Sequence, residues 1–519
     1  MIERMKALAA GQGNPLGGSE GNVMTRLVFC GTVLAVNGVV MSVEMLSTRL
    51  LFPRYGNTVF TWSAVISIVI AGLFLGYMAG GWLADRAKDG AKRLVFWELL
   101  ASGILVSAVP WMCDALLPAA PSGTTPPLLG CFVVFGLPAA ALAAVGPAVV
   151  GILAAGGWSA SFSSGVVSSL AAAGSIGGTL LTTFSLIPAF GVRALFGGLG
   201  GVLGAAALAV LVAGRGSPRL GQAAGGLAVF AAAVLGLSAA SAGVPAPAAG
   251  VPVFEKDSAY QLVRVFETGD GAKLLRILML DSTQEGAMRP WDRAVVFEYT
   301  TAYRLMVNAL KGRPSPRILF IGGGAYAMPL RVAAELPGST VEVAEIDPLV
   351  ADVGKMYFRA GETPNLKTLL MDGRRALAGE AGRYDGVFID AYQGVMAIPF
   401  HLTTREFFAE VRRSLKPGGV AGMNVIGRVD ESRGLFCAMA QSIGAEFPSA
   451  AFHPIHGAGG GLQNIIVTAS PEAGADLSGV LAGTAFSRGF GLASLPCAPG
   501  QAMTDDHAPA EWLAAKYLE

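Results

Sequence analysis

The pattern of hydrophobic and polar positions divides the chain into two unlike parts. Only two of the residues between Arg93 and Arg193 are charged, and the stretch from Leu220 to Val253 has no charge at all. Such runs exceed the roughly 20 apolar residues that a helix needs to cross a bilayer. The pattern therefore predicts a multi-span α-helical membrane domain over residues 25–243, after which charged residues return at ordinary density.

Seven apolar runs in this first part are long enough to be membrane spans. They cover residues 25–47, 59–84, 94–117, 128–155, 163–187, 192–213 and 220–242. Several contain glycine, alanine and serine at close spacing, as in Gly174–Gly178 and Gly197–Gly204. Small residues of this kind let helices approach each other closely in lipid, so we expect a tightly packed bundle.

The second part begins with a change of composition. Residues 244–258 are rich in proline, alanine and glycine and are predicted to be a linker. Strand-like runs at 260–268 and 273–281, separated by Gly269-Asp270-Gly271, predict a β-hairpin, and a helical stretch follows. We expect the hairpin and this helix to form a subdomain over residues 259–312.

From residue 313 to residue 519, strand and helix patterns alternate. Strands are predicted near 317–321, 340–345, 366–370, 384–390, 418–425 and 463–468. Helices are predicted near 327–336, 348–360, 404–415 and 432–446. This alternation is typical of a Rossmann-like α/β domain with a largely parallel sheet.

A strand, a tight glycine turn, a helix and a second strand follow one another within Arg317–Pro348. The glycines Gly322–Gly324 let a ligand approach the backbone, and Glu345, about 20 positions later, can hold ribose hydroxyls. A structural turn in another α/β fold is the alternative. Asp372 and Asp390 lie at two further predicted strand ends, where ligands of open α/β sheets bind, and they favour a nucleoside site.

Composition argues against several other kinds of site. The net charge of +1 gives no basic face for nucleic acid. The five cysteines form no CxxC pair, so we expect packing residues and neither a disulfide framework nor a metal site. His453 and His456 flank a proline and have no carboxylate or cysteine close by, which argues against a metal site there.

An ordered series of short motifs in the second part resembles the spermidine synthase (polyamine aminopropyltransferase) family. The motifs are Tyr-Gln at 260–261, Leu-Asp-Ser-Thr-Gln-Glu at 280–285, Phe-Glu-Tyr at 297–299, Gly-Gly-Gly-Ala-Tyr at 322–326, Glu-Ile-Asp at 345–347, Asp-Gly at 372–373, Tyr-Asp-Gly-Val-Phe-Ile-Asp at 384–390 and Leu-Lys-Pro-Gly-Gly at 415–419. The whole chain resembles the membrane-fused branch of that family. Its segment 72–86, GLFLGYMAGGWLADR, is similar to a loop of major facilitator transporters.

The resemblance implies that decarboxylated S-adenosylmethionine binds as a co-substrate, with no metal. Glu345 would hold its ribose hydroxyls, Asp372 would meet its adenine amino group, and Gln261 would lie near its methionine-derived tail. The residues with an implied contact to this co-substrate are Gln261, Gly322, Gly323, Gly324, Glu345, Asp347, Asp372 and Gly373.

The resemblance also implies a catalytic residue and a site for a small amine. Asp390 would take a proton from the attacking amine, which is protonated at neutral pH and must lose that proton before it attacks. Gln284 would lie near the amine. His401 follows the Asp390 strand and either reaches the pocket or belongs to a structural loop, which is the role we favour from the sequence alone.

Two positions depart from the family pattern, and both remove negative charge. Soluble members follow the glycines with an aspartate, where this chain has Ala325-Tyr326. They also carry an acid three positions after the catalytic aspartate, where this chain has Gln393. Asp505 and Asp506, in Thr-Asp-Asp-His-Ala-Pro at 504–509, either restore charge beside the substrate or cap a helix that begins at residue 510.

These inferences predict an aminopropyltransferase that moves an aminopropyl group to a diamine such as putrescine and releases methylthioadenosine. Another S-adenosylmethionine-using enzyme on the same fold, an N-methyltransferase or a lyase, is the first alternative, which the missing acids favour. A transporter with a nucleoside-sensing domain is the second alternative, although seven spans are few for a major facilitator.

The charges beside the spans indicate an orientation. Arg4, Lys6 and Arg26 place the tail formed by residues 1–24 in the cytoplasm. Seven spans would then put the α/β domain outside, whereas a charged sulfonium does not cross lipid unaided. We therefore expect an even number of crossings, in a multi-pass protein of the cell (inner) membrane with a cytoplasmic catalytic domain. The expected partners are the lipid bilayer and a small-molecule amine, and a homodimer is compatible with the resemblance.

Overall fold

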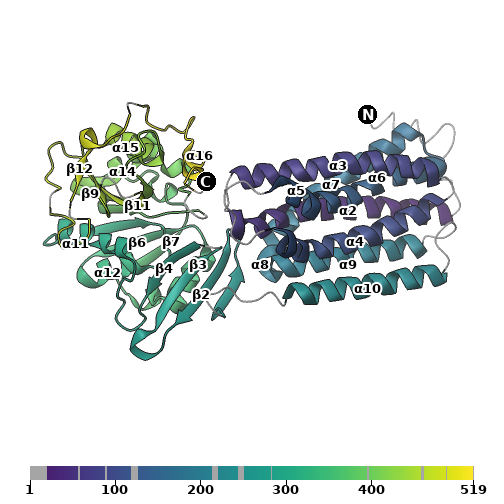
Figure 1. Ribbon diagram of the computed structural model, residues 1–519, viewed down its shortest axis with the longest axis horizontal. Coiled ribbons are helices and arrows are strands. Elements are labelled where there is room, and N and C mark those ends of the chain that lie inside the picture. Colours follow the sequence, from purple (N-terminus) through teal and green to yellow (C-terminus); the bar gives the residue numbers. More distant parts are fainter. Residues whose placement is uncertain are drawn as a thin grey trace. The chain divides into compact units, whose positions relative to one another are not determined.

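The chain folds into a helical unit and an α/β unit, which divide near residue 245 (Figure 1). The computed structural model describes residues 20–517 except 56–58, 88–89, 118–126, 213–219, 243–250, 282, 394–396, 458–460, 478, 487 and 499. Most of the predicted tail 1–24 and about half of the predicted linker 244–258 therefore lie outside the described residues.

The helical unit has a helix over each of the seven apolar runs. The elements are α2 (Glu20–Tyr55), α3 (Val59–Ala87), α4 (Ala91–Leu116), α5 (Leu128–Cys131), η2 (Phe132–Gly136), α6 (Leu137–Ala155), α7 (Ala160–Leu181), η3 (Thr182–Leu186), α8 (Ile187–Phe190), α9 (Val192–Val212) and α10 (Leu220–Ala242). Within the described ranges, six helices are long and apolar enough to cross a membrane, and α10 contains the shorter apolar helix Gly221–Leu237.

Small residues bring α2 and α7 into close contact. A side chain at Gly174 would collide with the carbonyl oxygen of Leu34, and one at Gly178 would collide with that of Gly38. The backbones can approach this closely because glycine has no Cβ atom. The prediction of close packing from glycine spacing is confirmed for this helix pair.

Helix α10 packs against α4 and α9. Its Phe230 ring is buried and fills the space that side chains at Gly103 of α4 and Gly204 of α9 would need. At 23 residues and about 1.5 Å per residue, α10 is long enough to match the roughly 30 Å of a bilayer core. It therefore packs as a full member of the helical bundle.

The α/β unit begins with an antiparallel sheet whose strands follow sequence order. They are β1 (Phe254–Asp257), β2 (Leu262–Thr268), β3 (Leu275–Leu280) and β4 (Thr283–Met288). The predicted hairpin corresponds to β2 and β3, and the sequence analysis missed β1 and β4. A 3₁₀ segment η5 (Glu298–Tyr303) and helix α11 (Arg304–Leu310) lead to the main sheet.

The main sheet has eight strands in the order β12-β10-β11-β9-β8-β5-β6-β7. They are β5 (Arg317–Ile321), β6 (Thr340–Glu345), β7 (Leu366–Leu370), β8 (Tyr384–Ile389), β9 (Leu415–Arg428), β10 (Ser449–Pro454), β11 (Leu462–Ser470) and β12 (Phe490–Gly491). Strands β5 to β9 pair in parallel, and β10 to β12 are antiparallel. The strand order reverses between β5 and β8, which is where such sheets bind ligands.

Alternate residues of the central strands enter two different cores. In β5, Leu319 and Ile321 pack into one core, whereas Ile318 and Phe320 pack into the other. The helices on the first side are α14 (Arg405–Ser414), α15 (Leu435–Glu446) and α16 (Ala510–Ala515), and those on the second are α11, α12 (Ala327–Glu335) and α13 (Pro348–Tyr357). Burial on both faces explains why these strands are continuously apolar.

The cysteine prediction was wrong for one pair. Cys437 of α15 and Cys497 form a disulfide, with their Cα atoms 5.4 Å apart. They are 60 residues apart in sequence, and no local spacing marks them, because the pair forms only when the C-terminal segment returns to α15. Cys30, Cys113 and Cys131 are not part of a disulfide, and the last two are buried, as expected of packing residues.

Candidate active site

A cavity of about 830 Å³ lies at the carboxyl ends of the parallel strands. Of the residues singled out from the sequence, Gln261, Gln284, Gly322, Gly323, Gly324, Glu345, Asp372, Gly373, Asp390, Gln393 and His401 line it. The wall opposite the main sheet comes from β4 and the segment around Tyr299. The small sheet and the main sheet thus enclose the site between them.

The glycine turn after β5 is held by its neighbours in the sheet. The N–H of Gly323 donates a hydrogen bond of 2.9 Å to Oε2 of Glu345. Gly322 has a φ of +97° and packs so closely on the backbone of Asp390 that a Cβ atom would collide with it. A residue with a side chain would be strained there, so the turn needs glycine. The turn joins the ends of β5, β6 and β8 into one surface.

Glu345 is almost fully buried, and both of its oxygens accept backbone hydrogen bonds. The second comes from the N–H of Asp347, at 2.9 Å. Burial raises the pKa of Glu345 to about 7, while the two backbone hydrogen bonds act in the opposite direction. Its carboxyl is therefore fixed at the cavity wall, with the remaining lone pairs available to a ligand.

Asp390 follows β8 and has a fixed amide partner. Nδ2 of Asn424 donates a hydrogen bond of 3.0 Å to Oδ1 of Asp390, and Nδ2 of Asn464 donates one of 3.0 Å to Oδ1 of Asn424. Burial raises the pKa of Asp390 to about 6, although the Asn424 hydrogen bond lowers it. A carboxyl with this pKa can accept a proton at neutral pH and return it to water.

Glu285 is an acidic residue of the site that the sequence analysis did not single out. It lies in β4 and lines the cavity. Its pKa is raised to about 8, first by burial and then by the charges of Asp390, Asp281 and Glu345. The hydroxyl of Tyr299 donates to the carbonyl of Glu285 at 3.5 Å. The motif at 280–285 contained this acid, but only the fold brings it beside Asp390.

Two further residues of the cavity wall were also missed. Asn424 is an isolated amide in the apolar strand β9, and a buried polar group in such a run was the available signal. His456 lines the cavity, whereas His453 is buried with its ring nitrogens 2.9 Å from the Phe486 carbonyl and 3.0 Å from the Thr468 hydroxyl. Only one of the two histidines therefore reaches the site.

Asp372 is paired with His401 at the cavity wall. Nε2 of His401 lies 2.9 Å from Oδ2 of Asp372. The backbone N–H groups of Arg374 and Arg375 donate to Oδ1 at 2.9 Å and 3.1 Å. The hydrogen bond from His401 is the main cause that lowers the pKa of Asp372, so this carboxylate is ionised at neutral pH. His401 reaches the pocket, contrary to the structural role that we favoured from the sequence.

Asp347 and Tyr326 lie beside the cavity and do not line it. Asp347 is fully buried, accepts a 2.6 Å hydrogen bond from the hydroxyl of Ser258 and caps α13 through the N–H of Leu349. Tyr326 is buried in the core, where its hydroxyl lies 3.1 Å from that of Thr368. The two positions that depart from the family pattern, Ala325-Tyr326 and Gln393, carry no charged side chain. Glu285 supplies an acid in the cavity.

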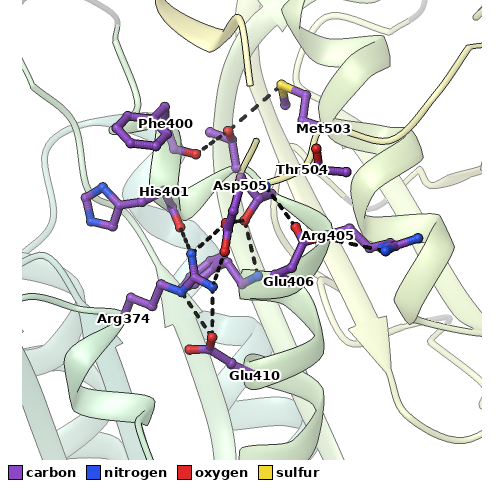
Figure 2. Close-up of polar contacts among 12 residues, drawn as sticks. Arg374, Phe400, His401, Arg405, Glu406, Glu410, Met503, Thr504 and Asp505 are labelled. Carbon is purple, nitrogen blue, oxygen red and sulfur yellow. Dashed lines mark hydrogen bonds and ion pairs between the residues drawn. The ribbon is translucent and has the colours of Figure 1, made fainter. Parts of the chain in front are cut away.

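Asp505 and Asp506 do not line the cavity. Asp505 forms an ion pair with Arg374 through two hydrogen bonds of 2.8 Å, and it accepts another from the hydroxyl of Thr404 (Figure 2). Helix α16 begins after Pro509 with no side-chain cap. The capping role is therefore wrong, and Asp505 instead joins the C-terminal segment to the loop that follows β7.

The described residues contain no group of three or more His, Cys, Asp or Glu side chains that could hold a metal ion. The acids that line the cavity come from several segments, among them Glu285 of β4, Glu345 of β6, and Asp372 and Asp390, which follow β7 and β8. Their arrangement suits a cationic organic ligand, because several carboxyl groups face one enclosed volume with the polar glycine turn at its base.

Comparison with known proteins finds relatives of the C-terminal part of the chain. Residues 301–467 match the family model described as the spermine/spermidine synthase domain. The polyamine aminopropyltransferase of Vibrio vulnificus is 32% identical over 182 residues, which cover 33% of this chain and 58% of that protein. Putrescine N-methyltransferase 1 of Nicotiana tabacum is 29% identical over 175 residues, covering 32% of this chain and 44% of that protein.

A solved structure also resembles the chain. It is that of a probable spermidine synthase from Corynebacterium glutamicum, with 20% identity and a TM-score of 0.43, and the match covers 49% of this chain and 97% of that one. The chain spans little more than half the length of the Vibrio relative. Residues 301–467 of the α/β unit match the spermine/spermidine synthase domain model, and the helical unit lies outside the matched residues.

Proposed function

We propose that this chain, whose C-terminal part carries a spermine/spermidine synthase domain, is a membrane-bound aminopropyltransferase. It would transfer the aminopropyl group of decarboxylated S-adenosylmethionine to a diamine such as putrescine and release methylthioadenosine. The observation that carries this proposal is the presence of two carboxyl groups, those of Asp390 and Glu285, in the cavity that also holds the glycine turn.

The cavity has a nucleoside end and an amine end. At the nucleoside end, Glu345 would accept the ribose hydroxyls and Asp372 would accept the adenine amino group. At the amine end, Gln261, Gln284 and Gln393 offer amide groups. Asp347 would contribute without lining the cavity, because it accepts a hydrogen bond from the Ser258 hydroxyl, which in turn accepts the N–H of Gln261. Asp505 enters this proposal only through its ion pair with Arg374, and Asp506 has no role in it.

The reaction is a displacement at the carbon beside the sulfonium sulfur. The amine nitrogen forms a bond to this carbon, the carbon–sulfur bond breaks, and its electron pair stays on sulfur as the neutral thioether. Asp390 would take the proton that the attacking nitrogen loses. Glu285, protonated near neutral pH, would donate a hydrogen bond or pair with the distal ammonium of the diamine once ionised.

An N-methyltransferase acting on a diamine is the second candidate. The similarity to a putrescine N-methyltransferase and the uncharged Gln393 favour it. Both candidates share the amine and the nucleoside and differ in the group that is transferred. Purified protein should be incubated separately with the decarboxylated and the intact cofactor, and the products identified by mass. An aminopropylated diamine from the first incubation supports our proposal, and a methylated diamine from the second overturns it.

We further propose that the helical unit spans a membrane, with α10 as its seventh crossing. Six long apolar helices and the packing of α10 against α4 and α9 support this count. The basic residues near the N-terminus, those of segment 85–93 and Arg215 and Arg219 all precede α10 and fall on one side of the membrane, so they set the orientation of the bundle and not the number of its crossings.

This topology puts the α/β unit on the side opposite the N-terminus, against the cytoplasmic location expected from the sequence. The disulfide between Cys437 and Cys497 favours the same side, because disulfides persist in oxidising compartments and are rare in the cytosol. We therefore propose that the α/β unit faces the oxidising side of the membrane. The sulfonium co-substrate would have to be delivered across the bilayer, since a cation does not cross lipid unaided.

A further inference from the structure

The carboxylate of Asp372 is held on one oxygen by its own loop and on the other by His401, which lies 29 residues later in the chain. Its Oδ1 atom accepts the N–H of Arg374 at 2.9 Å, and its Oδ2 atom lies 2.9 Å from Nε2 of His401. Asp372 and His401 both line the cavity. Two segments therefore set the orientation of the Asp372 carboxylate and of its remaining lone pairs. They are the loop after β7 and the 3₁₀ segment η8 (Phe400–Leu402).

The guanidinium of Arg374 connects these two segments (Figure 2). Its Nη1 atom donates to the backbone carbonyl of His401 at 3.4 Å, while the backbone of Arg374 itself holds Asp372. Figure 2 shows the Arg374 side chain lying between the His401 backbone and the carboxyl groups of Glu410 and Asp505. Arg374 does not line the cavity, so it acts on the site through the backbone of its neighbours.

Two carboxylates fix the guanidinium in place. Glu410 of α14 accepts Nε and Nη2 of Arg374 at 3.1 Å and 2.9 Å. Asp505 accepts Nη1 and Nη2 at 2.8 Å each. A planar guanidinium with all three nitrogens bound to carboxylates has little freedom to turn, and its geometry suits this bidentate pairing.

Asp505 belongs to a segment that is itself anchored to the body of the unit. The N–H of Met503 donates to the hydroxyl of Ser442, and its carbonyl accepts the N–H of Arg405 at 2.8 Å. The hydroxyl of Thr404 donates to Asp505 at 2.7 Å. Eight residues earlier, Cys497 is bonded to α15. The carboxylate of Asp505 is thus presented to Arg374 from a fixed backbone.

We propose that Asp505 and Arg374 are positioning residues for nucleobase selection. Together they hold the loop after β7 and segment η8 so that Asp372 accepts the exocyclic amino group of an adenine nucleoside. The inference rests on the proposed function in assuming that the cavity binds such a nucleoside at Asp372. It assigns the Thr-Asp-Asp-His-Ala-Pro segment to the nucleobase end of the cavity, whereas the sequence suggested a role beside the amine.

The test compares two ligands that differ only in the amino group. Methylthioadenosine and its counterpart with hydrogen at purine C6 are titrated by calorimetry into the full-length protein and its variants in detergent. In Asp505→Ala and Arg374→Ala we expect the affinity for methylthioadenosine to fall about tenfold, the usual scale for one lost hydrogen bond. The affinity for the counterpart should change less than about twofold, because it makes no hydrogen bond to Asp372.

The matched control is Asp430→Ala. Asp430 also pairs with an arginine through two hydrogen bonds, of 3.2 Å and 3.0 Å to Arg428, and neither side chain lines the cavity. This variant should keep the discrimination of the original protein. A conservative Asp505→Glu variant should recover part of the lost discrimination if its carboxylate still reaches Arg374.

The other possible results separate the positioning role of Asp505 from the proposed function. Equal losses of affinity for both ligands in Asp505→Ala, or unchanged discrimination, would overturn the positioning role. An Asp505→Ala protein that does not fold leaves Arg374→Ala and Asp505→Glu to decide. If the unaltered protein binds neither ligand, the proposed function fails, whereas binding without any effect of the variants refutes only the present inference.

Discussion

Asn424 donates a hydrogen bond of 3.0 Å to Oδ1 of Asp390. In the described part of the chain, no side chain is hydrogen-bonded to the other carboxyl oxygen of Asp390. Asp390 itself lines the cavity. The amide therefore fixes the orientation of the carboxyl and leaves one oxygen for a ligand. Asn464 holds Asn424 in turn, so the direction of the Asp390 carboxyl is set by β9 and β11.

Replacement of Asp390 by asparagine should separate binding from chemistry. Asparagine has the same shape and cannot take a proton, so turnover should fall at least about 100-fold, the usual contribution of a general base. The affinity for methylthioadenosine should change little, because the nucleoside end of the cavity is not altered. Initial rates with calorimetry on the same sample check both parts. Near-normal turnover would remove Asp390 from the mechanism.

Glu345→Gln should mainly weaken nucleoside binding. The N–H groups of Gly323 and Asp347 bond different oxygens of Glu345, so the glutamine amide can accept only one of them, and its NH₂ group cannot accept a ribose hydroxyl. We expect a loss of about 1–3 kcal/mol in the binding of methylthioadenosine, measured by calorimetry. The affinity for the diamine alone serves as the internal control. An unchanged nucleoside affinity would contradict the ribose contact.

The raised pKa of Glu285 predicts a pH dependence of stability. Its pKa is about 8 in the folded chain, while a glutamate in an unfolded chain titrates near ~4.3. Between these values the folded state holds a proton that the unfolded state has released, so the free energy of unfolding should decrease as the pH rises through this window. Asp390 and Glu345, with pKa values of about 6 and about 7, act in the same direction over narrower windows.

Glu285→Gln isolates the contribution of this residue. The amide keeps the shape and carries no ionisable proton, so the midpoint of thermal unfolding should fall less between pH 5 and pH 8 than in the unaltered protein. Glu267→Gln, which removes an acid from the exposed β2–β3 ion pair with Arg276, is the matched control and should leave that fall unchanged. Identical pH profiles for the original protein and Glu285→Gln would show that Glu285 is not held protonated.

The sequence predicted the elements of the α/β unit better than it predicted side-chain partners. Strands β5 to β8 were located to within one residue, because a strand buried on both faces is a continuous apolar run ending in a turn. Strand β12 has only two residues and could not be recognised from any pattern. The small strand β4 was missed because it carries Gln284, Glu285 and Gly286, and its polar residues face the cavity.

Contacts between distant segments were beyond any local pattern. Asp505 and Arg374 are 131 residues apart, and their ion pair follows from the path of the chain after β12. The same return of the chain brings Cys497 to Cys437. Glycines were more informative, because the glycine turn follows the apolar strand β5 directly, although the contact that requires glycine at position 322 comes from the backbone of Asp390 after β8. Sequence reasoning therefore located residues that line the cavity and misjudged what the C-terminal segment contacts.

The redox state of Cys437 and Cys497 tests the proposed sidedness. A variant that lacks Cys30, Cys113 and Cys131 retains only the disulfide pair. Thiols are trapped by acid in intact cells, and the denatured protein is then treated with a maleimide of high mass, with and without prior reduction. We expect no gel shift before reduction and a double shift after it. A double shift without reduction would show cytosolic thiols and restore the cytoplasmic location.

Accessibility gives an independent measure of the same prediction. In a variant lacking the three free cysteines, a cysteine placed at Asp270, in the exposed β2–β3 turn, should react in intact cells with a maleimide that cannot cross membranes. A cysteine placed at Lys92, at the start of α4, should react only after the cells are broken, because the positive-inside rule puts that end of the helix in the cytoplasm. Seven crossings require the two positions to differ, since five helical segments separate them. If neither cysteine reacts until the cells are broken, an even number of helices crosses the bilayer between the N-terminus and the α/β unit. In that case α10 packs in the bundle without crossing the bilayer.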